Sequence, residues 1–265
     1  MSRYAHYRAI AAERHGRLLV LTLNRPDALN AVNAELHSEL SRIFIDVRED
    51  KDCDIVMLTG AGRAFCAGGD LDWMQRSIDE PALFDETARE AKAIVFGQLD
   101  LDKPVICRLN GHAVGLGASL ALLCDVIIAA DNAKIGDPHV SVGLVAGDGG
   151  ALIWPQLIGY AKAKHYLFTG ELMTAAEAEK LGLITQAVPA AELDAATSAY
   201  AERLMSQPLK ALRWTKVTTN LPLKALFHAH FDTGVAYETV SNLTADHQEA
   251  VRAFAEKRKP RFTGS

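Results

Sequence analysis

The chain contains 265 residues, of which 49% are hydrophobic and 23% are charged. This composition is typical of a folded globular protein and excludes a mainly disordered or fibrous chain. The formal net charge of −5 argues against a general nucleic-acid-binding role. No apolar run approaches the roughly 18 residues of a membrane span. The four cysteines form no C-x-x-C pair, and the N-terminus lacks an apolar signal core, so we expect a cytoplasmic protein.

Predicted strands and helices alternate in the first part of the chain. Apolar runs predict buried strands over 18–23, 55–59, 105–109 and 126–129. Helical spacing predicts helices over 32–47, 81–100 and 117–123. Asn30 or Asn33 is expected to cap the first of these helices. Strands that are apolar throughout and alternate with helices favour an α/β fold with a parallel sheet covered on both faces.

The pattern becomes almost entirely helical after about residue 174. One strand is predicted over 183–188, and helices are predicted over 175–181, 191–206, 209–220, 223–240 and 245–258. We therefore expect a core region, 1–195, and a C-terminal helical region, 196–265.

Two glycine-rich segments each follow a predicted strand and lead into a helix. They are Ala64-Phe65-Cys66-Ala67-Gly68-Gly69-Asp70 and Asn110-Gly111-His112-Ala113-Val114-Gly115-Leu116-Gly117. Glycine lets a ligand approach the backbone, and free N–H groups at a helix start attract negative charge. Two such turns that face one point can hold an oxyanion. The alternative is two tight turns without a ligand; neither segment has the Rossmann or P-loop pattern.

An ordered set of motifs resembles the enoyl-CoA hydratase/isomerase (crotonase) superfamily. In addition to the two glycine segments, the motifs are N24-R-P-D-A-L-N30, G143-L-V-A-G-D-G-G150, T169-G-E-L-M-T-A-A-E-A with L181-G-L-I, and F254-A-E-K-R-K-P-R-F262. The resemblance covers nearly the whole chain. It implies a crotonase-like spiral of ββα units followed by a C-terminal helical trimerisation region, and a homotrimer or dimer of trimers.

The resemblance also implies an acyl-CoA substrate and an oxyanion hole. The N–H groups of Gly69 and Leu116 occupy the positions that form this hole in the family. The residues expected along the coenzyme A path are Ala28, Leu29, Ala67, Gly68, Asp70, Leu71 and Gly117. Asp70 is also expected to cap a helix. Coenzyme A is expected as part of the substrate, and neither a tightly bound cofactor nor a metal is expected.

The sequence departs from the family at the two glutamates that hydratases use. Ser119 and His139 occupy their positions. Histidine titrates near pH 6.5, so His139 is a candidate general acid or base, with a supporting, non-catalytic histidine as the alternative. Asp148 is a second candidate, with a helix cap as the alternative. Ser119 is expected to be either a small filler or a nucleophile.

Three functions follow from these residues. The first is a lyase or isomerase in which an oxyanion hole stabilises a thioester enolate and His139 or Asp148 moves the proton. The second is an acyl-CoA hydrolase that uses Ser119, His139 and Asp148 as nucleophile, base and orienting acid. The third is an acyl-CoA-binding protein without catalysis, since both glutamates are absent.

Overall fold

A six-stranded sheet forms the centre of the molecule in the computed structural model, which describes residues 3–265. In spatial order its strands are β1 (Ile10–His15), β2 (Leu18–Leu23), β3 (Ile55–Gly60), β4 (Val105–Leu109), β6 (Val126–Ala130) and β9 (Gln186–Val188). β1 and β2 are antiparallel, whereas every later neighbouring pair is parallel. The predicted α/β fold class is therefore confirmed.

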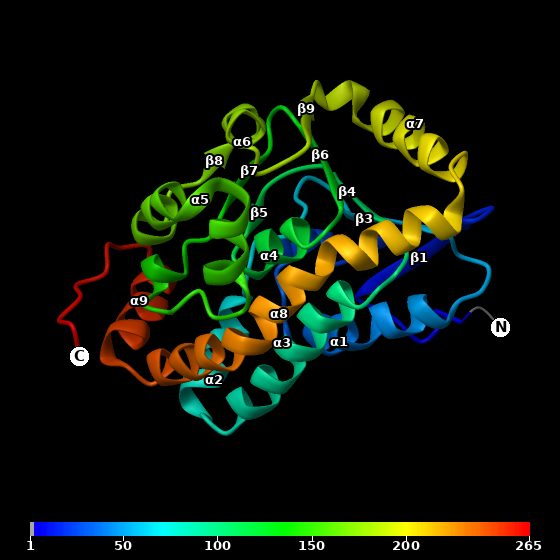
Figure 1. The fold of residues 1–265 in the computed structure, drawn as a ribbon. Helices are drawn as coiled ribbons and strands as arrows, with labels where there is room; N and C mark the ends of the chain where they lie inside the picture. The colour runs from blue at the N-terminus through cyan, green and yellow to red at the C-terminus, as the bar shows by residue number, and fades with distance from the viewer. Residues whose placement is uncertain (1–2) are drawn as a thin grey trace.

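Helices cover both faces of this sheet (Figure 1). Side chains alternate between the two faces of a strand. In β3, Val56 and Leu58 belong to the main core, whereas Ile55 and Met57 pack in a separate cluster with Ala201 of the helix α7 (Leu193–Met205). This burial on both faces explains why the strand is apolar throughout.

The helices are α1 (Ala34–Glu49), α2 (Leu71–Asp79), α3 (Leu83–Leu99), α4 (Leu116–Leu122), α5 (Gly150–Thr169), α6 (Ala175–Leu181), α7 (Leu193–Met205), α8 (Leu209–Asn242) and α9 (Ala245–Ala255). Six helices, α1, α3, α4, α6, α7 and α9, begin and end close to the predicted positions, whereas no bounds were predicted for α2 and α5. Short 3-10 helices are η1 (Pro26–Ala28), η2 (His139–Val142) and η3 (Ala190–Glu192). Asn33 caps α1 by accepting a hydrogen bond from the Leu36 amide, and Asp70 caps α2.

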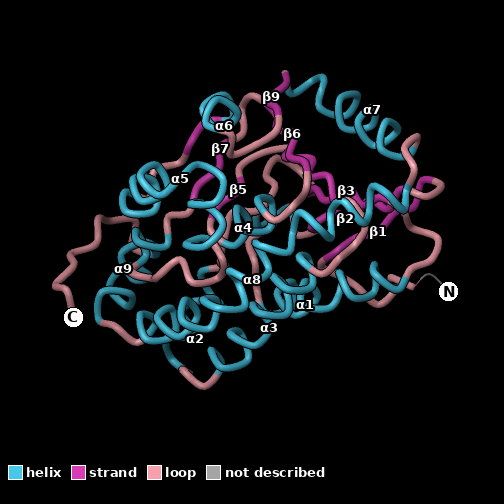
Figure 2. The backbone as a smooth tube through the Cα atoms, in the orientation of Figure 1, coloured by secondary structure: helices cyan, strands magenta, loops and turns pink. Residues whose placement is uncertain are grey.

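A second, smaller sheet contains β5 (Ala113–Val114), β7 (Lys134–Gly136) and β8 (Met173–Thr174). These strands are too short to produce a hydrophobic pattern, and the sequence analysis did not predict them. Figure 2 shows β5 and β7 near α4, α5 and α6. The Gly115 amide donates to the Gly136 carbonyl over 3.0 Å. This sheet therefore fixes the second glycine segment against the chain that leads to His139.

The longest helix, α8, corrects the prediction of two helices over 209–220 and 223–240. It runs without a break through Pro222, alongside α3 (Figure 1). Proline removes one helical hydrogen bond and normally ends a helix. Both Pro222 and Thr218, whose carbonyl loses its partner, are exposed, so water can replace that bond. Phe227 and Phe231 of the same helix lie in the main core and hold it in place.

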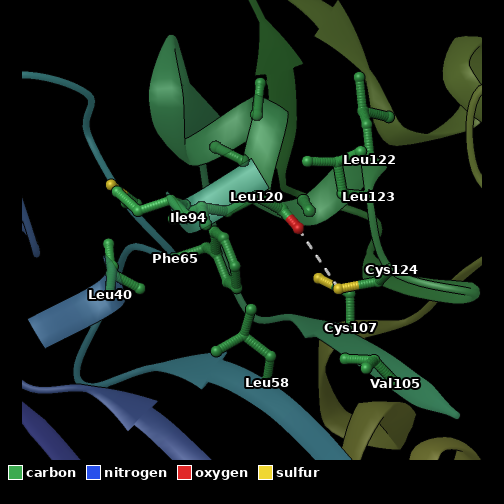
Figure 3. Packing of buried hydrophobic residues seen from close by; sticks show 14 of the residues in the cluster. Leu40, Leu58, Phe65, Ile94, Val105, Cys107, Leu120, Leu122, Leu123 and Cys124 are labelled. Carbon is green, nitrogen blue, oxygen red and sulfur yellow. Dashed lines mark hydrogen bonds between the residues drawn. The ribbon is translucent and has the colours of Figure 1, made fainter. Parts of the chain in front are cut away.

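The main core also anchors the first glycine segment. Phe65 lies among Leu58, Ile94 and Leu120 in the close view of Figure 3 and is completely buried. The nearby Cys124 thiol donates to the Leu120 carbonyl over 3.4 Å. No helix within residues 3–265 is both long and apolar enough to cross a membrane.

Candidate active site

The two glycine segments lie side by side. Cys66 and Ala113 form a parallel bridge, and the Val114 amide donates to the Cys66 carbonyl over 2.9 Å. Gly115 has a φ of +56°, and a Cβ atom placed on it would lie 3.9 Å from the Cα atom of Gly68. The folded chain therefore brings together the two turns that the sequence analysis singled out.

Two backbone amides are available at this junction. Leu116 is the first residue of α4, where the N–H has no partner within the helix. Gly69 lies opposite Val32 in a parallel bridge. The hydrogen bonds of this bridge join Val32 to Gly68 and Asp70, so the Gly69 amide takes no part in them. Within residues 3–265, neither the Gly69 nor the Leu116 amide donates a hydrogen bond. Both predicted oxyanion-hole residues line the inner cavity described below, with amides that make no hydrogen bond in the described chain.

His139 lies beside these turns, between two carboxylates. Its Cε1 atom is 3.5 Å from the position that a Cβ atom on Gly115 would take. Its Nδ1 atom bonds Oδ1 of Asp137, which follows β7 directly. Its Nε2 atom is 3.7 Å from Oδ2 of Asp148. The imidazole therefore bridges Asp137 and Asp148 at the edge of the candidate oxyanion hole.

The carboxylates keep a proton on His139. Burial alone disfavours the imidazolium ion, but attraction by Asp137 and Asp148 outweighs burial and raises the pKa of His139 well above 6.5. Burial raises the pKa of Asp148, and His139 opposes that rise. The site therefore presents an imidazole that holds its proton firmly beside a carboxyl group whose basicity is enhanced.

Ser119 contacts Asp148 rather than His139. Its hydroxyl donates to Asp148 Oδ1 over 3.2 Å, and the Gly150 amide donates to the same oxygen over 3.3 Å. Ser119 is completely buried and does not line the cavities described below. The second carboxylate oxygen, Oδ2 of Asp148, is buried without a hydrogen-bond partner in the described part of the chain. Ser119 therefore positions Asp148 through Oδ1 and leaves Oδ2 without a hydrogen bond.

Glu238 of α8 joins this group, although the sequence analysis did not select it. Burial, followed by repulsion from Asp148, raises the pKa of Glu238 to about 8. Gly147 makes this approach possible, because a Cβ atom there would overlap the Gly234 carbonyl of α8 and lie 2.8 Å from Glu238 Oε2. Helical spacing in the sequence could have pointed to Glu238. Phe227, Phe231 and Val235 form a buried stripe along the helix, and position 238 continues this stripe.

Two hollows meet at His139. An inner cavity of about 100 Å³ lies between α2, α3, η2 and α8, and an outer groove lies over the glycine turns. Gly69, Met74, His139 and Val142 line both. The inner cavity is mainly apolar, with walls that include Trp73 and Phe84, and Asp148 and Glu238 lie at its polar side. A ligand can therefore extend from the groove past His139 into the cavity.

Most residues predicted for the coenzyme A path line the outer groove. They are Ala28, Ala67, Gly68, Asp70 and Leu71. Asp70 also forms an ion pair with Arg25 over 3.1 Å, which balances its charge. Leu29 and Gly117 do not line the groove. A Cβ atom on Gly117 would lie 2.6 Å from the Cβ atom of Cys66, so this glycine allows the two turns to pack closely.

Asp137, His139 and Asp148 each place one possible ligand atom within 4.8 Å of the others. However, Asp137 lies at Nδ1 of the histidine and Asp148 lies near Nε2. The two carboxylates therefore approach opposite ring nitrogens, which suits proton transfer through the imidazole better than coordination of one cation.

Comparisons with known proteins identify the family of this chain. The sequence profile of the enoyl-CoA hydratase/isomerase family matches residues 13–265. A probable enoyl-CoA hydratase from Mycobacterium bovis is 35% identical over 262 residues, covering 97% of this chain and 98% of that protein. A crystal structure of an enoyl-CoA hydratase/isomerase from Mycobacterium paratuberculosis is 38% identical, with a TM-score of 0.89 over 92% of this chain and 97% of the other.

A third relative has a different activity in its name. It is a β-diketone hydrolase from the cyanobacterium Anabaena, solved with (S)-3-oxocyclohexyl acetic acid bound. It is 29% identical, with a TM-score of 0.85 over 92% of this chain and 97% of the other. Together, these relatives confirm the crotonase-type fold that the motifs predict.

Proposed function

The chain belongs to the enoyl-CoA hydratase/isomerase family and is an enzyme that acts on an acyl-CoA thioester, and we propose that it moves protons through a thioester enolate. The coenzyme A part would lie in the outer groove and the acyl group in the inner cavity. The Gly69 and Leu116 amides would hold the thioester oxygen. His139 and Asp148 would replace the two glutamates of the hydratases.

In the hydration reaction, His139 is the acid and Asp148 is the base. Asp148 Oδ2 takes a proton from water as the water oxygen bonds to the β-carbon of an enoyl group. The electrons of the double bond move toward the thioester oxygen, and the resulting enolate takes the Nε2 proton of His139 at its α-carbon. The proton gained by Asp148 then returns to His139 across the 3.7 Å gap. The same two groups can instead shift a double bond by removing one proton and adding another.

The observation that carries this proposal is the position of His139. It lines both hollows, lies beside Gly115, and has Asp137 bonded to Nδ1 and Asp148 3.7 Å from Nε2. Acid–base catalysis needs a proton-bearing group whose pKa is set by its surroundings. His139 is such a group, and it lies in a cavity beside free backbone amides.

Hydrolysis is a second candidate, and the β-diketone hydrolase relative favours it. Here the nucleophile would be a water molecule rather than Ser119, because Ser119 is buried behind Asp148. Water activated at His139 and Asp148 would attack the β-carbonyl carbon of a β-ketoacyl-CoA. The bond between the carbonyl carbon and the α-carbon would break, and His139 would protonate the released carbanion.

The decisive experiment follows product masses in H₂¹⁸O with panels of enoyl-CoA and β-ketoacyl-CoA substrates. Labelled hydroxyacyl-CoA identifies hydration, unlabelled positional isomers identify isomerisation, and a labelled carboxylate identifies hydrolysis. We expect His139→Gln and Asp148→Asn each to lower kcat by at least about 100-fold. The matched control is His165→Gln, because His165 is exposed and lies beside Glu171.

Two outcomes would reject the catalytic proposal. If His139→Gln and His165→Gln have equal activity, His139 does not transfer the proton. If all substrates bind and none reacts with the wild-type protein, the chain is a binding member of the family.

We also propose a homotrimer or a dimer of trimers, assembled through the C-terminal helical region. Large apolar side chains are exposed on α8, including Trp214, Tyr237 and Val240, and Phe254 is exposed on α9. Such side chains gather at protein interfaces. Light scattering coupled to size-exclusion chromatography should give a mass of three or six chains, and a monomer would reject the assembly.

A further inference from the structure

His247 of α9 lies in the wall of the inner cavity and has one ring nitrogen without a hydrogen-bond partner in the described chain. It is completely buried, and its side chain lines the cavity. Thr244 caps the start of the helix by accepting a hydrogen bond from the His247 amide. Gly143 packs directly on this turn, since a Cβ atom there would lie 2.9 Å from the His247 Cα atom. The position of the imidazole is therefore fixed by the backbone around it.

The tautomer of His247 follows from its one hydrogen bond. Nδ1 lies 2.6 Å from the Val142 carbonyl oxygen. A carbonyl oxygen can only accept, so Nδ1 carries the hydrogen. Burial lowers the pKa of His247, and the positive charge of His139 acts in the same direction, so the ring is neutral. Nε2 therefore carries a lone pair and is an acceptor.

This lone pair has no donor in the described chain. Nε2 of His247 is buried and makes no hydrogen bond within residues 3–265. A buried acceptor without a partner is costly, and native structures normally satisfy it with protein, water or ligand. Because the residue lines the cavity, a donor can come from a group bound there.

We propose that the inner cavity selects acyl groups that carry a hydroxyl group beyond the reacting α- and β-carbons, and that this hydroxyl donates to Nε2 of His247. A carboxylate has no proton to donate, and an ammonium ion would lose its hydration in a mainly apolar cavity. A neutral hydroxyl is the simplest donor that fits both conditions. This inference rests on the proposed placement of the acyl group in the inner cavity.

Two substitutions separate the acceptor from the structural role of His247. His247→Asn keeps an amide N–H near the position of Nδ1, where it can still donate to Val142, but it removes the acceptor at Nε2. His247→Gln places an amide group near the position of Nε2 and loses the bond to Val142. Thermal melting of both variants would establish that they fold.

The test measures binding without turnover. The probes are hexanoyl-CoA and its 4-, 5- and 6-hydroxy derivatives, which are saturated and cannot undergo hydration. Isothermal titration calorimetry gives Kd for the wild-type protein and both variants. For the wild type, we expect at least one hydroxy derivative to bind about tenfold more tightly than hexanoyl-CoA, as one recovered hydrogen bond predicts. His247→Asn should abolish this preference, and His247→Gln should retain part of it.

The outcomes distinguish this inference from the proposed function. If hexanoyl-CoA binds and none of the hydroxy derivatives binds more tightly, hydroxyl recognition is wrong while acyl-CoA binding stands. If the preference persists in His247→Asn, a different group recognises the hydroxyl. If no acyl-CoA binds to the wild-type protein, both the proposed function and this inference fail.

Discussion

Replacing Glu238 with glutamine should stabilise the protein more at alkaline pH than at acidic pH. Burial and neighbouring carboxylates raise the pKa of Glu238 from 4.5 to about 8. Between these values the native protein retains a proton that the unfolded chain has released. The native state therefore binds more protons, and stability falls as the pH rises through this interval. Glutamine has nearly the same shape and cannot ionise, so Glu238→Gln removes this loss.

The shift in pKa sets the size of the effect. One pKa unit corresponds to about 1.36 kcal/mol, so ionisation of Glu238 would cost the wild-type protein about 3 kcal/mol between pH 6 and pH 9. Glu238 is only partly buried, so water screens some of this interaction. We therefore expect Glu238→Gln to gain about 1–2 kcal/mol relative to wild type over this range, or roughly 2–5 °C in Tm.

The assay is urea unfolding of both proteins at pH 6 and pH 9 at one ionic strength. Glu202→Gln on α7 controls for the loss of an exposed carboxylate. The reasoning is refuted if the stability difference between Glu238→Gln and wild type is the same at both pH values. It is also refuted if the variant loses stability relative to wild type as the pH rises.

Three further substitutions test the groups around His139. Asp137→Asn should lower the pKa of His139, and the alkaline limb of the kcat/KM profile should move to lower pH; an unchanged limb contradicts this. Gly150→Ala should lower Tm and the free energy of unfolding by about 1–3 kcal/mol, because its Cβ atom would overlap Asp137 Oδ2; a wild-type Tm would argue against the close contact. Ser119→Ala should lower kcat by about tenfold, since it removes one hydrogen bond to Asp148, whereas loss of more than about a thousandfold would indicate a nucleophile.

His139 was identified because the family resemblance places it where hydratases have a glutamate, and Asp148 because it lies between two glycines. Local spacing placed Asp148 just before a helix, and α5 does begin at Gly150. The motifs could not show that the two side chains meet, because they lie nine positions apart, with η2 and a loop between them. That meeting depends on the tertiary path from β7 to α5.

The remaining site residues come from distant parts of the chain. Glu238 reaches the site only because α8 packs back across the core, and a lone glutamate on a helix otherwise resembles a surface charge. His247 requires knowledge of the contact between α9 and η2. Single-sequence patterns describe neighbours along the chain, so neither residue had a local signal strong enough to select it.

Tertiary structure also explains two differences from the predicted elements: β1 was not predicted, and α8 was predicted as two helices. β1 is an edge strand that pairs with β2 on one side only, and exposed residues such as Glu13 and Arg14 conceal it. Pro222 suggested a helix boundary, but packing of the flanking helix against the core outweighed the local preference. Tertiary contacts thus overrode propensity in both cases.

The walls of the inner cavity have separate origins. Small and apolar side chains, among them Ala88 and Ala91, come from α3, whereas the proton-carrying groups lie on η2, the loop before α5, and α8. Mutations on α3 can therefore change the size of the acyl group that fits without altering the charges around His139. This separation makes the scaffold evolvable: new substrates can be acquired by drift in one wall while the chemistry is conserved in the other, and directed evolution should begin at α3.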